Sequence, residues 1–386
     1  MNYHRHFSFE FPARIEFGIG IIRRLGEFVR SLGGGNVLVV TDPGLVKAGV
    51  VARVGAVLDG EGIGHTIFQE IESEPDARSV VAAVDTYRQN RCDAIVAVGG
   101  GSALDAGKAI SVMLTNPGHI RDYAGLGLVR QPGVPFIAIP TTAGTGSEAT
   151  IWAVISEKDR KGKFGVGSTL LVPKIALCDP ELTLSLPPRI TAVTGIDAMS
   201  HALESYVNKA TQPISEALAE RALSLVARSL RTAVFAGDTL TARADMLLAS
   251  SMAAMAFNAT RLGLAHALAM PLGAQAKIPH ADVIAILMPP VMEFNLLGNL
   301  EKFARLAEIF GQPSGDLPVR DAAERGAREV TRLIQDLGAP CRLSNYGVQE
   351  SDLEGFAEAA MQTGNIPVNP RVTTAADLVA IMRQCL

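Results

Sequence analysis

Four side chains suited to binding a metal ion lie between residues 197 and 280. Asp197 and His201 are four residues apart, so on a helix they project from the same face. His266 and His280 follow, fourteen residues apart. One carboxylate and three imidazoles, without thiolates, suit a divalent first-row metal such as iron or zinc at a catalytic site. We therefore predict a catalytic metal centre at these four residues.

The same residues also have a simpler interpretation. An Asp and a His at this spacing occur on many helices, and a lone histidine is often a satisfied core group. The context favours the metal centre, because three of the seven histidines fall in this region, within segments rich in apolar and small residues. An unpaired aspartate would be costly to bury in such surroundings.

Helices are the elements that must position these ligands. Beyond residue 185, apolar positions recur at helical spacing and strand-like runs are nearly absent. The expected helices are 191–208, 212–235, 242–258, 263–277, 300–311 and 319–337. The pair Pro187-Pro188 marks a boundary near residue 185, so we expect an all-helical metal-binding domain over residues 186–386.

The first part of the chain, residues 1–185, alternates short apolar strands with helices. Strands are expected at 36–40, 65–68, 93–98 and 136–139, a hairpin at 152–156 and 164–168 around a charged turn, and helices at 22–31, 45–60, 76–90 and 103–112. Residues 7–17 alternate like a strand or hairpin that could pair with a second subunit. The alternation predicts an α/β, doubly wound nucleotide-binding domain.

Two strand ends in this domain suit a dinucleotide. Asp42 follows the strand 36–40, at the edge that faces the cofactor in nucleotide-binding α/β folds. Its carboxylate would bind the adenosine ribose and repel a 2′-phosphate, which favours NAD over NADP, or it would simply cap the following turn. The strand 93–98 runs into Gly99-Gly100-Gly101-Ser102, where unhindered N–H groups at a helix start suit a pyrophosphate. A plain tight turn would also explain these glycines.

Several blocks together resemble the iron-containing (group III) alcohol dehydrogenases. They are Gly99-Gly100-Gly101-Ser102-x-x-Asp105-x-x-Lys108, Pro140-Thr141-Thr142-Ala143-Gly144-Thr145-Gly146-Ser147-Glu148, Thr194-Gly195-Ile196-Asp197-Ala198-x-x-His201, Gly263-x-x-His266 with Pro279-His280, and Asn369-Pro370-Arg371. The blocks span nearly the whole chain in the family's order. The resemblance implies the dehydroquinate synthase-like fold, in which the α/β domain binds NAD(P) and the helical domain binds the metal.

The resemblance also assigns cofactor contacts. It implies that the loop Gly99–Gly101 with Ser102 holds the NAD(P) diphosphate, and that Asp105 and Lys108 belong to the same motif. It places Thr141, Thr142 and Thr145 against the cofactor and puts Lys163 at a cofactor-contacting position. We also include Leu182, shortly before the domain boundary, among the expected cofactor-binding residues.

One position departs from the family pattern. Many members carry a second histidine four residues after the third ligand, which is thought to help move the alcohol proton. Here the position is Met270, whose thioether cannot carry a proton, so transfer would pass through water or the cofactor ribose in a more apolar pocket. Arg261 stands where the family often has a small residue, and its guanidinium would bind an anionic substrate group or pair on the surface. Trp152, Phe257 and Asn365 are further candidates for the substrate pocket.

The composition is typical of a globular protein without a nucleic-acid or membrane partner. Of 386 residues, 48% are hydrophobic and 19% charged, the formal net charge is −4, and no basic run occurs. The four cysteines lack C-x-x-C spacing, which fits a reducing cytoplasm. The N-terminus lacks the apolar core of a signal peptide and no apolar run reaches the length of a membrane span. We expect a cytoplasmic homodimer or higher homo-oligomer.

These observations predict a metal-dependent oxidoreductase that transfers a hydride between NAD(H) and a small alcohol or aldehyde, with aldehyde reduction favoured. The ion, Fe²⁺ in preference to Zn²⁺, would act as a Lewis acid on the substrate oxygen. Three alternatives stay open. One is a maleylacetate reductase. That enzyme resembles chains that lack the intact ligand set, so the four ligands present here weigh against it. Another is a lyase of the dehydroquinate synthase kind, which would need a dense Lys and Arg cluster, and the third is a non-catalytic assembly subunit, favoured only by Met270.

Overall fold

The computed structural model describes residues 6–157 and 162–386 of the chain. The start of the N-terminal segment examined for a signal peptide and the centre of the expected charged turn at 158–161 lie outside these residues. The chain divides into two compact units. One is Phe11–Leu186, and the other is Pro187–Leu386 together with the described N-terminal residues 6–10.

The unit Phe11–Leu186 is built on a six-stranded sheet in the order β1-β9-β6-β4-β2-β3. The strands are β1 (Arg14–Phe17), β2 (Asn36–Val40), β3 (Gly64–Phe68), β4 (Ala94–Gly99), β6 (Phe136–Pro140) and β9 (Ile175–Cys178). All of their pairings are parallel. The central strands are short apolar runs buried along their whole length, as expected when both faces of a parallel sheet are covered.

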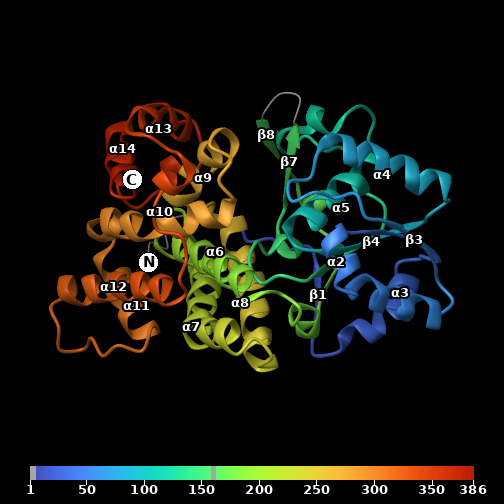
Figure 1. Ribbon diagram of the computed structural model, residues 1–386, viewed down its shortest axis with the longest axis horizontal. Coiled ribbons are helices and arrows are strands. Elements are labelled where there is room, and N and C mark those ends of the chain that lie inside the picture. The colour runs from blue at the N-terminus through green and yellow to red at the C-terminus, as the bar shows by residue number, and fades with distance from the viewer. Residues whose placement is uncertain (1–5, 158–161) are drawn as a thin grey trace. The chain divides into compact units, whose positions relative to one another are not determined.

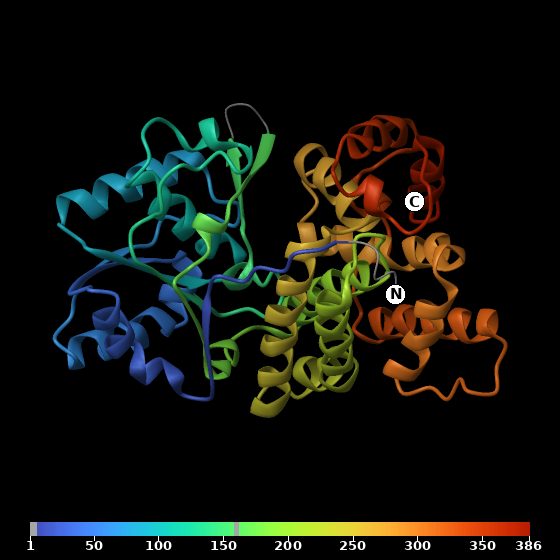
Figure 2. The same cartoon turned by 180° about the vertical axis from the view of Figure 1, so that it is seen from behind.

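Helices cover both faces of this sheet, as the opposite views in Figure 1 and Figure 2 show. They are α1 (Leu25–Ser31), α2 (Pro43–Lys47), α3 (Val50–Gly60), α4 (Ala77–Gln89) and α5 (Gly101–Met113). Alternate residues of β2 enter different cores: Leu38 and Val40 pack with α4 and α5, whereas Val37 and Val39 pack with α1 and α3. The doubly wound α/β prediction is therefore confirmed.

A smaller three-stranded sheet, in the order β5-β8-β7, belongs to the same unit. Its strands β7 (Trp152–Glu157) and β8 (Gly162–Gly167) form the expected antiparallel hairpin, and β5 (Gly125–Leu126) is an addition that the sequence did not predict. Short 3-10 helices connect the larger elements: η1 (Ile21–Arg24), η2 (Ile120–Tyr123), η3 (Ser147–Ala149), η5 (Thr169–Leu171) and η6 (Pro180–Thr183).

In the part of the chain that the structure describes, the regular elements from Pro187 onward are all helices. The α-helices are α6 (Pro188–Val207), α7 (Pro213–Phe235), α8 (Leu240–Thr260), α9 (Leu264–Gln275), α10 (His280–Asn295), α11 (Leu300–Ile309), α12 (Val319–Asp336), α13 (Leu353–Met361) and α14 (Ala375–Arg383). The 3-10 helices η7 (Leu296–Gly298), η8 (Ser344–Tyr346), η9 (Glu350–Asp352) and η10 (Ile366–Val368) connect them. Helices α6, α7 and α8 pack extensively against one another (Figure 1). The expected all-α character of this part is confirmed.

Several boundaries differ from the sequence predictions. The helix expected at 45–60 is two helices, because Gly49 takes the left-handed conformation with φ of 79°. Only residues 14–17 of the segment 7–17 form a strand, which pairs with β9. Helix α10 was not expected at all. Its stretch His280–Gly298 is long and apolar enough by length and composition to cross a membrane, but most of it is buried inside the structure, as in the core helix of a soluble protein.

Candidate metal centre

Helix α6 carries two of the predicted ligands in its buried middle. Pro188 occupies the first helical position, where its missing N–H is not needed. Gly195 lets α7 approach closely, because a Cβ at this position would lie 2.2 Å from a terminal carbon of Leu230. Asp197 and His201 follow on the next two turns, and their side chains are almost fully buried. The helix is thus held tightly from the side that faces α7, which fixes where its ligands point.

The other two predicted ligands come from α9 and the start of α10. His266 lies in the first turn of α9, whose N-cap residue is Gly263. His280 is the first residue of α10, and its side chain is 43% exposed, unlike those of the other three. The start of α10 is fixed by Asp282, which is buried and accepts hydrogen bonds from Arg189 at 3.2 Å and from the Tyr346 hydroxyl at 2.8 Å.

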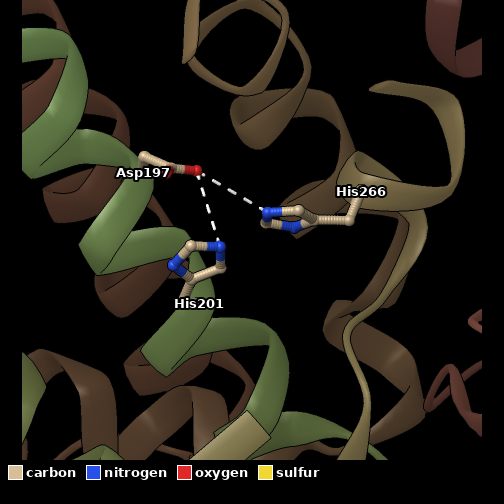
Figure 3. Close-up of side chains that lie close together, drawn as sticks. All are labelled: Asp197, His201 and His266. Atoms are coloured by element: carbon tan, nitrogen blue, oxygen red, sulfur yellow. Dashed lines mark ion pairs between the residues drawn. The ribbon is translucent and has the colours of Figure 1, made fainter. Parts of the chain in front are cut away.

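The three histidine side chains converge on the Oδ1 atom of Asp197. The Nε2 atom of His266 lies 3.6 Å from it, and the Nε2 atoms of His201 and His280 each lie 3.7 Å from it. Figure 3 shows three of the side chains pointing toward one another from α6 and α9. The rings of His201 and His266 are stacked, with centroids 4.7 Å apart. Asp197 and His280, 83 positions apart in the sequence, therefore offer donor atoms to one point.

The geometry fits a bound cation better than a closed hydrogen-bond network. Asp197 Oδ1 and His266 Nε2 are buried, and neither has a hydrogen-bond partner. Separations of 3.6–3.7 Å are too long for hydrogen bonds. They are short enough for atoms that each lie about 2.0–2.2 Å from one shared ion. The ligand atoms of Asp197, His201 and His266 all lie within 4.8 Å of one another, so these residues fit a divalent metal.

The protonation of the cluster also favours a cation. Burial alone would raise the pKa of Asp197, but the neighbouring imidazoles, His201 foremost, hold it well below its usual range. Burial lowers the pKa of His201 to about 4. Burial would also lower the pKa of His266, but the carboxylates of Glu204 and Asp197 raise it to about 9. The carboxylates around His266 thus stabilise positive charge on its ring, and an ion bound at Nε2 would be stabilised by the same charges.

Glu204 is a residue of this centre that the sequence analysis missed. One oxygen of its carboxylate lies 2.7 Å from Nδ1 of His266, and the carboxylate also accepts the backbone N–H groups of Gly263 and Ala265. Glu204 is three residues after His201 and seven after Asp197, so it shares their face of α6. That spacing was the available signal, but it identifies a partner only after α9 is known to pack there.

The glycine-rich turn between β4 and α5 forms a narrow cradle. A Cβ on Gly101 would lie 2.7 Å from Cγ2 of Thr145, and one on Gly100 would lie 3.3 Å from Cγ2 of Thr142. A Cβ on Gly99 would lie 2.5 Å from Ala103 and 3.7 Å from Oδ2 of Asp42. The structure thus gathers most of the expected cofactor-binding residues around the first turn of α5, where free N–H groups favour an anion.

Asp42 also has the alternative role that the sequence left open, since its Oδ1 caps α2 by accepting the N–H of Leu45 at 3.1 Å. Its other oxygen faces Gly99. Of the remaining expected contacts, Ser102 donates its hydroxyl to the carbonyl of Ser73, and Thr141 is buried at the end of β6. Lys163 pairs with Glu74 at 2.5 Å, and Leu182 is buried in the core.

Asp105 and Lys108 brace the hairpin β7–β8 from inside α5. Lys108 is fully buried and donates to the Thr150 hydroxyl and to the carbonyl of Trp152, at 2.7 Å each. Asp105 accepts the hydroxyl of Ser147 at 2.5 Å and the N–H of Val154 at 2.9 Å. Burial raises the pKa of Asp105 and lowers that of Lys108 to about 8. These contacts hold the threonine-rich segment against α5.

The expected substrate-pocket residues occupy different surroundings. The ring of Phe257 lies 4.7 Å from that of His201, so it belongs to the metal centre. Arg261 ends α8 with φ of 65° and ψ of −170°, a conformation that is costly for a residue other than glycine, and its guanidinium lies over Gly364. Asn365 accepts the N–H of Leu262, which follows Arg261, at 3.4 Å. Trp152 packs on the glycines of β8, and Met270 on α9 is 37% exposed.

Comparison with known proteins identifies the architecture. A family model described as iron-containing alcohol dehydrogenase matches residues 12–180. A second, described as the C-terminal part of the Fe-containing alcohol dehydrogenase family, matches residues 191–386, which hold all four clustered ligands. The chain belongs to the iron-containing alcohol dehydrogenase family. Its fold and its motif order are those expected from the resemblance seen in the sequence.

Individual relatives of this iron-containing alcohol dehydrogenase match over nearly its full length. The 1,3-propanediol dehydrogenase of Klebsiella pneumoniae is 40% identical over 383 residues, which cover 99% of each chain. The NAD-dependent methanol dehydrogenase of Bacillus methanolicus is 37% identical, over 98% of this chain and 100% of that protein. The crystal structure of a 1,3-propanediol oxidoreductase superposes with a TM-score of 0.96 at 40% identity, covering 99% of this chain and 100% of the other. The chain is thus an alcohol/aldehyde oxidoreductase, and its family implies a divalent metal.

Proposed function

We propose that this enzyme transfers a hydride between NAD(H) and a small alcohol or aldehyde, that it favours aldehyde reduction, and that it does so with a divalent ion held by Asp197, His201, His266 and His280. The observation that carries the proposal is the convergence of these side chains, with two buried donor atoms that have no hydrogen-bond partner. When bound, the ion supplies a Lewis acid that stabilises negative charge on the substrate oxygen.

The side chains around the ion divide the remaining work. Asp197 supplies the negative charge that makes a buried cation tolerable. The ring of Phe257 lies 4.7 Å from that of His201 and gives this ligand an apolar neighbour. Met270 offers no proton donor or acceptor of the kind that a histidine would provide. The proton that accompanies the hydride must therefore come from water or from a ribose hydroxyl of the cofactor.

The choice of cofactor and ion follows from the same residues. Asp42 would accept a ribose hydroxyl and repel a 2′-phosphate, which supports NAD over NADP. The ligand set of one carboxylate and three imidazoles supports Fe²⁺ and admits Zn²⁺. We further propose that the enzyme acts in the cytoplasm as a homodimer or higher homo-oligomer. Its four free cysteines support a reducing compartment.

The proposal is tested on metal-stripped protein reloaded with Fe²⁺ or Zn²⁺. NADH absorbance is followed with a panel of short neutral and anionic aldehydes, and NAD⁺ reduction with the matching alcohols. We expect turnover only in the reloaded protein and a higher kcat/KM for the aldehydes. His266→Ala should abolish turnover and bind metal weakly while its NADH affinity, measured by fluorescence titration, stays close to that of the parent.

Two results would contradict this function. Equal turnover by His266→Ala and the parent would remove the ligand assignment. A fully metal-loaded parent that binds NADH but oxidises none of it across the panel would instead favour the non-catalytic alternative.

A further inference from the structure

We propose that Glu204 is a positioning residue of the metal centre: it holds His266 in the tautomer whose Nε2 atom is free for the ion, and it joins that ring to the start of α9. The inference rests on the proposed metal site but concerns a residue outside the ligand set.

Two backbone N–H groups and one imidazole nitrogen lie within hydrogen-bond distance of the Glu204 carboxylate. Oε2 accepts the backbone N–H of Gly263 at 2.8 Å and lies 2.7 Å from Nδ1 of His266, and Oε1 accepts the backbone N–H of Ala265 at 2.8 Å. An ionised carboxylate has no hydrogen to donate, so the short contact requires the hydrogen on Nδ1 of His266. In the neutral ring, Nε2 then carries no hydrogen. That is the atom which faces Asp197 Oδ1 at 3.6 Å.

The same carboxylate caps α9. Gly263, the N-cap residue of α9, has no side chain with which to cap it. Glu204 reaches across from α6 and accepts two of the first N–H groups, and its charge favours the positive end of the helix. It comes so close that a Cβ on Gly263 would lie 2.9 Å from Oε1 and 3.0 Å from Cδ. Helix α6 thus carries two ligands itself and sets the position of a third through Glu204.

A buried carboxylate in the other unit serves as a control for a purely structural role of Glu204. Asp179 is a buried carboxylate that likewise accepts backbone N–H groups, in its case three, those of Gly20, Ile22 and Glu181, at 3.0–3.1 Å. It contacts no histidine through these bonds. Asp179→Asn therefore costs the same kind of backbone anchoring without touching a metal ligand.

Glu204→Gln separates the two roles because an amide has only one acceptor oxygen. If that oxygen faces His266 and Gly263, the NH₂ group meets the N–H of Ala265, donor against donor. If the amide is turned around, its NH₂ group faces Nδ1 of His266, and the ring must carry its hydrogen on Nε2, where it blocks the ion. Either arrangement weakens metal binding, and the second changes the ligand itself.

The experiment uses the full chain, stripped of metal and titrated with Co²⁺ against a chelator, with visible absorption reporting the ligand field. We expect the Co²⁺ affinity of Glu204→Gln to fall by about 10- to 100-fold and its spectrum to change, as for other partners of metal-bound histidines. Asp179→Asn should lose comparable thermal stability but keep the affinity and spectrum of the parent. His266→Ala, run in parallel, reports on the metal site itself.

The outcomes are distinct. Parent-like affinity and spectrum in Glu204→Gln, or an equal loss in Asp179→Asn, would overturn the role of Glu204. Parent-like Co²⁺ binding by His266→Ala would instead overturn the metal site on which the inference rests. If Glu204→Gln does not fold, ¹⁵N-histidine NMR of the zinc-loaded parent decides. A hydrogen on Nδ1 of His266, with Nε2 bound to the metal, supports the proposal, and binding through Nδ1 overturns it.

Discussion

Gly101→Ala should weaken NADH binding without unfolding the enzyme. Gly101 is the first residue of α5, and a Cβ placed there would lie 2.7 Å from Cγ2 and 3.0 Å from Oγ1 of Thr145. Carbon atoms in contact prefer about 3.5–4.0 Å, so Thr145 or the glycine backbone must move by about 1 Å. Thr145 is a β-branched residue with few rotamers to choose from. The displacement therefore falls on the N–H groups that would bind the cofactor diphosphate.

The size of the effect follows from one lost charge-assisted hydrogen bond. Such a bond contributes about 1.5–3 kcal/mol. The dissociation constant for NADH should then rise by roughly 10- to 150-fold, at about 1.4 kcal/mol for each factor of ten. Fluorescence titration of NADH measures the constant, and urea denaturation monitors the fold.

Gly107→Ala is the matched control on the same helix. A Cβ there would lie 2.7 Å from Cβ of Ala97 and 3.0 Å from the ring of Phe136, in the core and not in the cradle. Overpacking of this kind costs about 1–3 kcal/mol of stability. NADH affinity should be unchanged. Parent-like affinity in a folded Gly101→Ala variant, or an equal loss of affinity in Gly107→Ala, would refute the assignment of this turn to the diphosphate.

Two further predictions concern single residues of the α/β unit. Asp42→Asn keeps a side chain that can cap α2 but removes the negative charge. The ratio of kcat/KM for NADPH to kcat/KM for NADH should therefore rise. An unchanged ratio would contradict the role of Asp42 in cofactor choice. Burial lowers the pKa of Lys108 from 10.5 to about 8 in the folded protein. Between these two pH values the unfolded chain binds more protons at Lys108 than the folded chain does, so the free energy of unfolding rises with pH. Urea denaturation at pH 7.5 and pH 10 measures this rise, which Lys108→Met should lack. An identical pH dependence in the parent and the variant would contradict the lowered pKa of Lys108.

Much of the fold could be read from patterns that are local in the sequence. Buried parallel strands are short apolar runs, and their ends are marked by residues such as Asp42 and the glycines of the β4–α5 turn. Asp197 and His201 were recognisable as a pair because helical spacing alone puts them on one face. The family resemblance supplied the order of the remaining blocks and thus the α/β plus all-α architecture.

What the sequence did not predict depends on contacts between distant segments. Helix α10 was missed because Pro289 and Pro290 lie inside it and because it is apolar on most sides, which hides the helical period. Lys108 would be solvated by default, yet packing against the hairpin buries it completely. Glu204 is an ordinary helix residue until α9 is brought beside α6. Each is a tertiary effect that local propensity does not encode.

The central claim is that Asp197, His201, His266 and His280 hold one divalent ion. Crystals of zinc-loaded enzyme, measured just above and just below the zinc absorption edge, test it most directly. We predict a single anomalous peak about 2.0–2.2 Å from an Asp197 oxygen and from Nε2 of each histidine. A peak at any other place, or no peak in protein shown to carry one zinc per chain, would contradict the account.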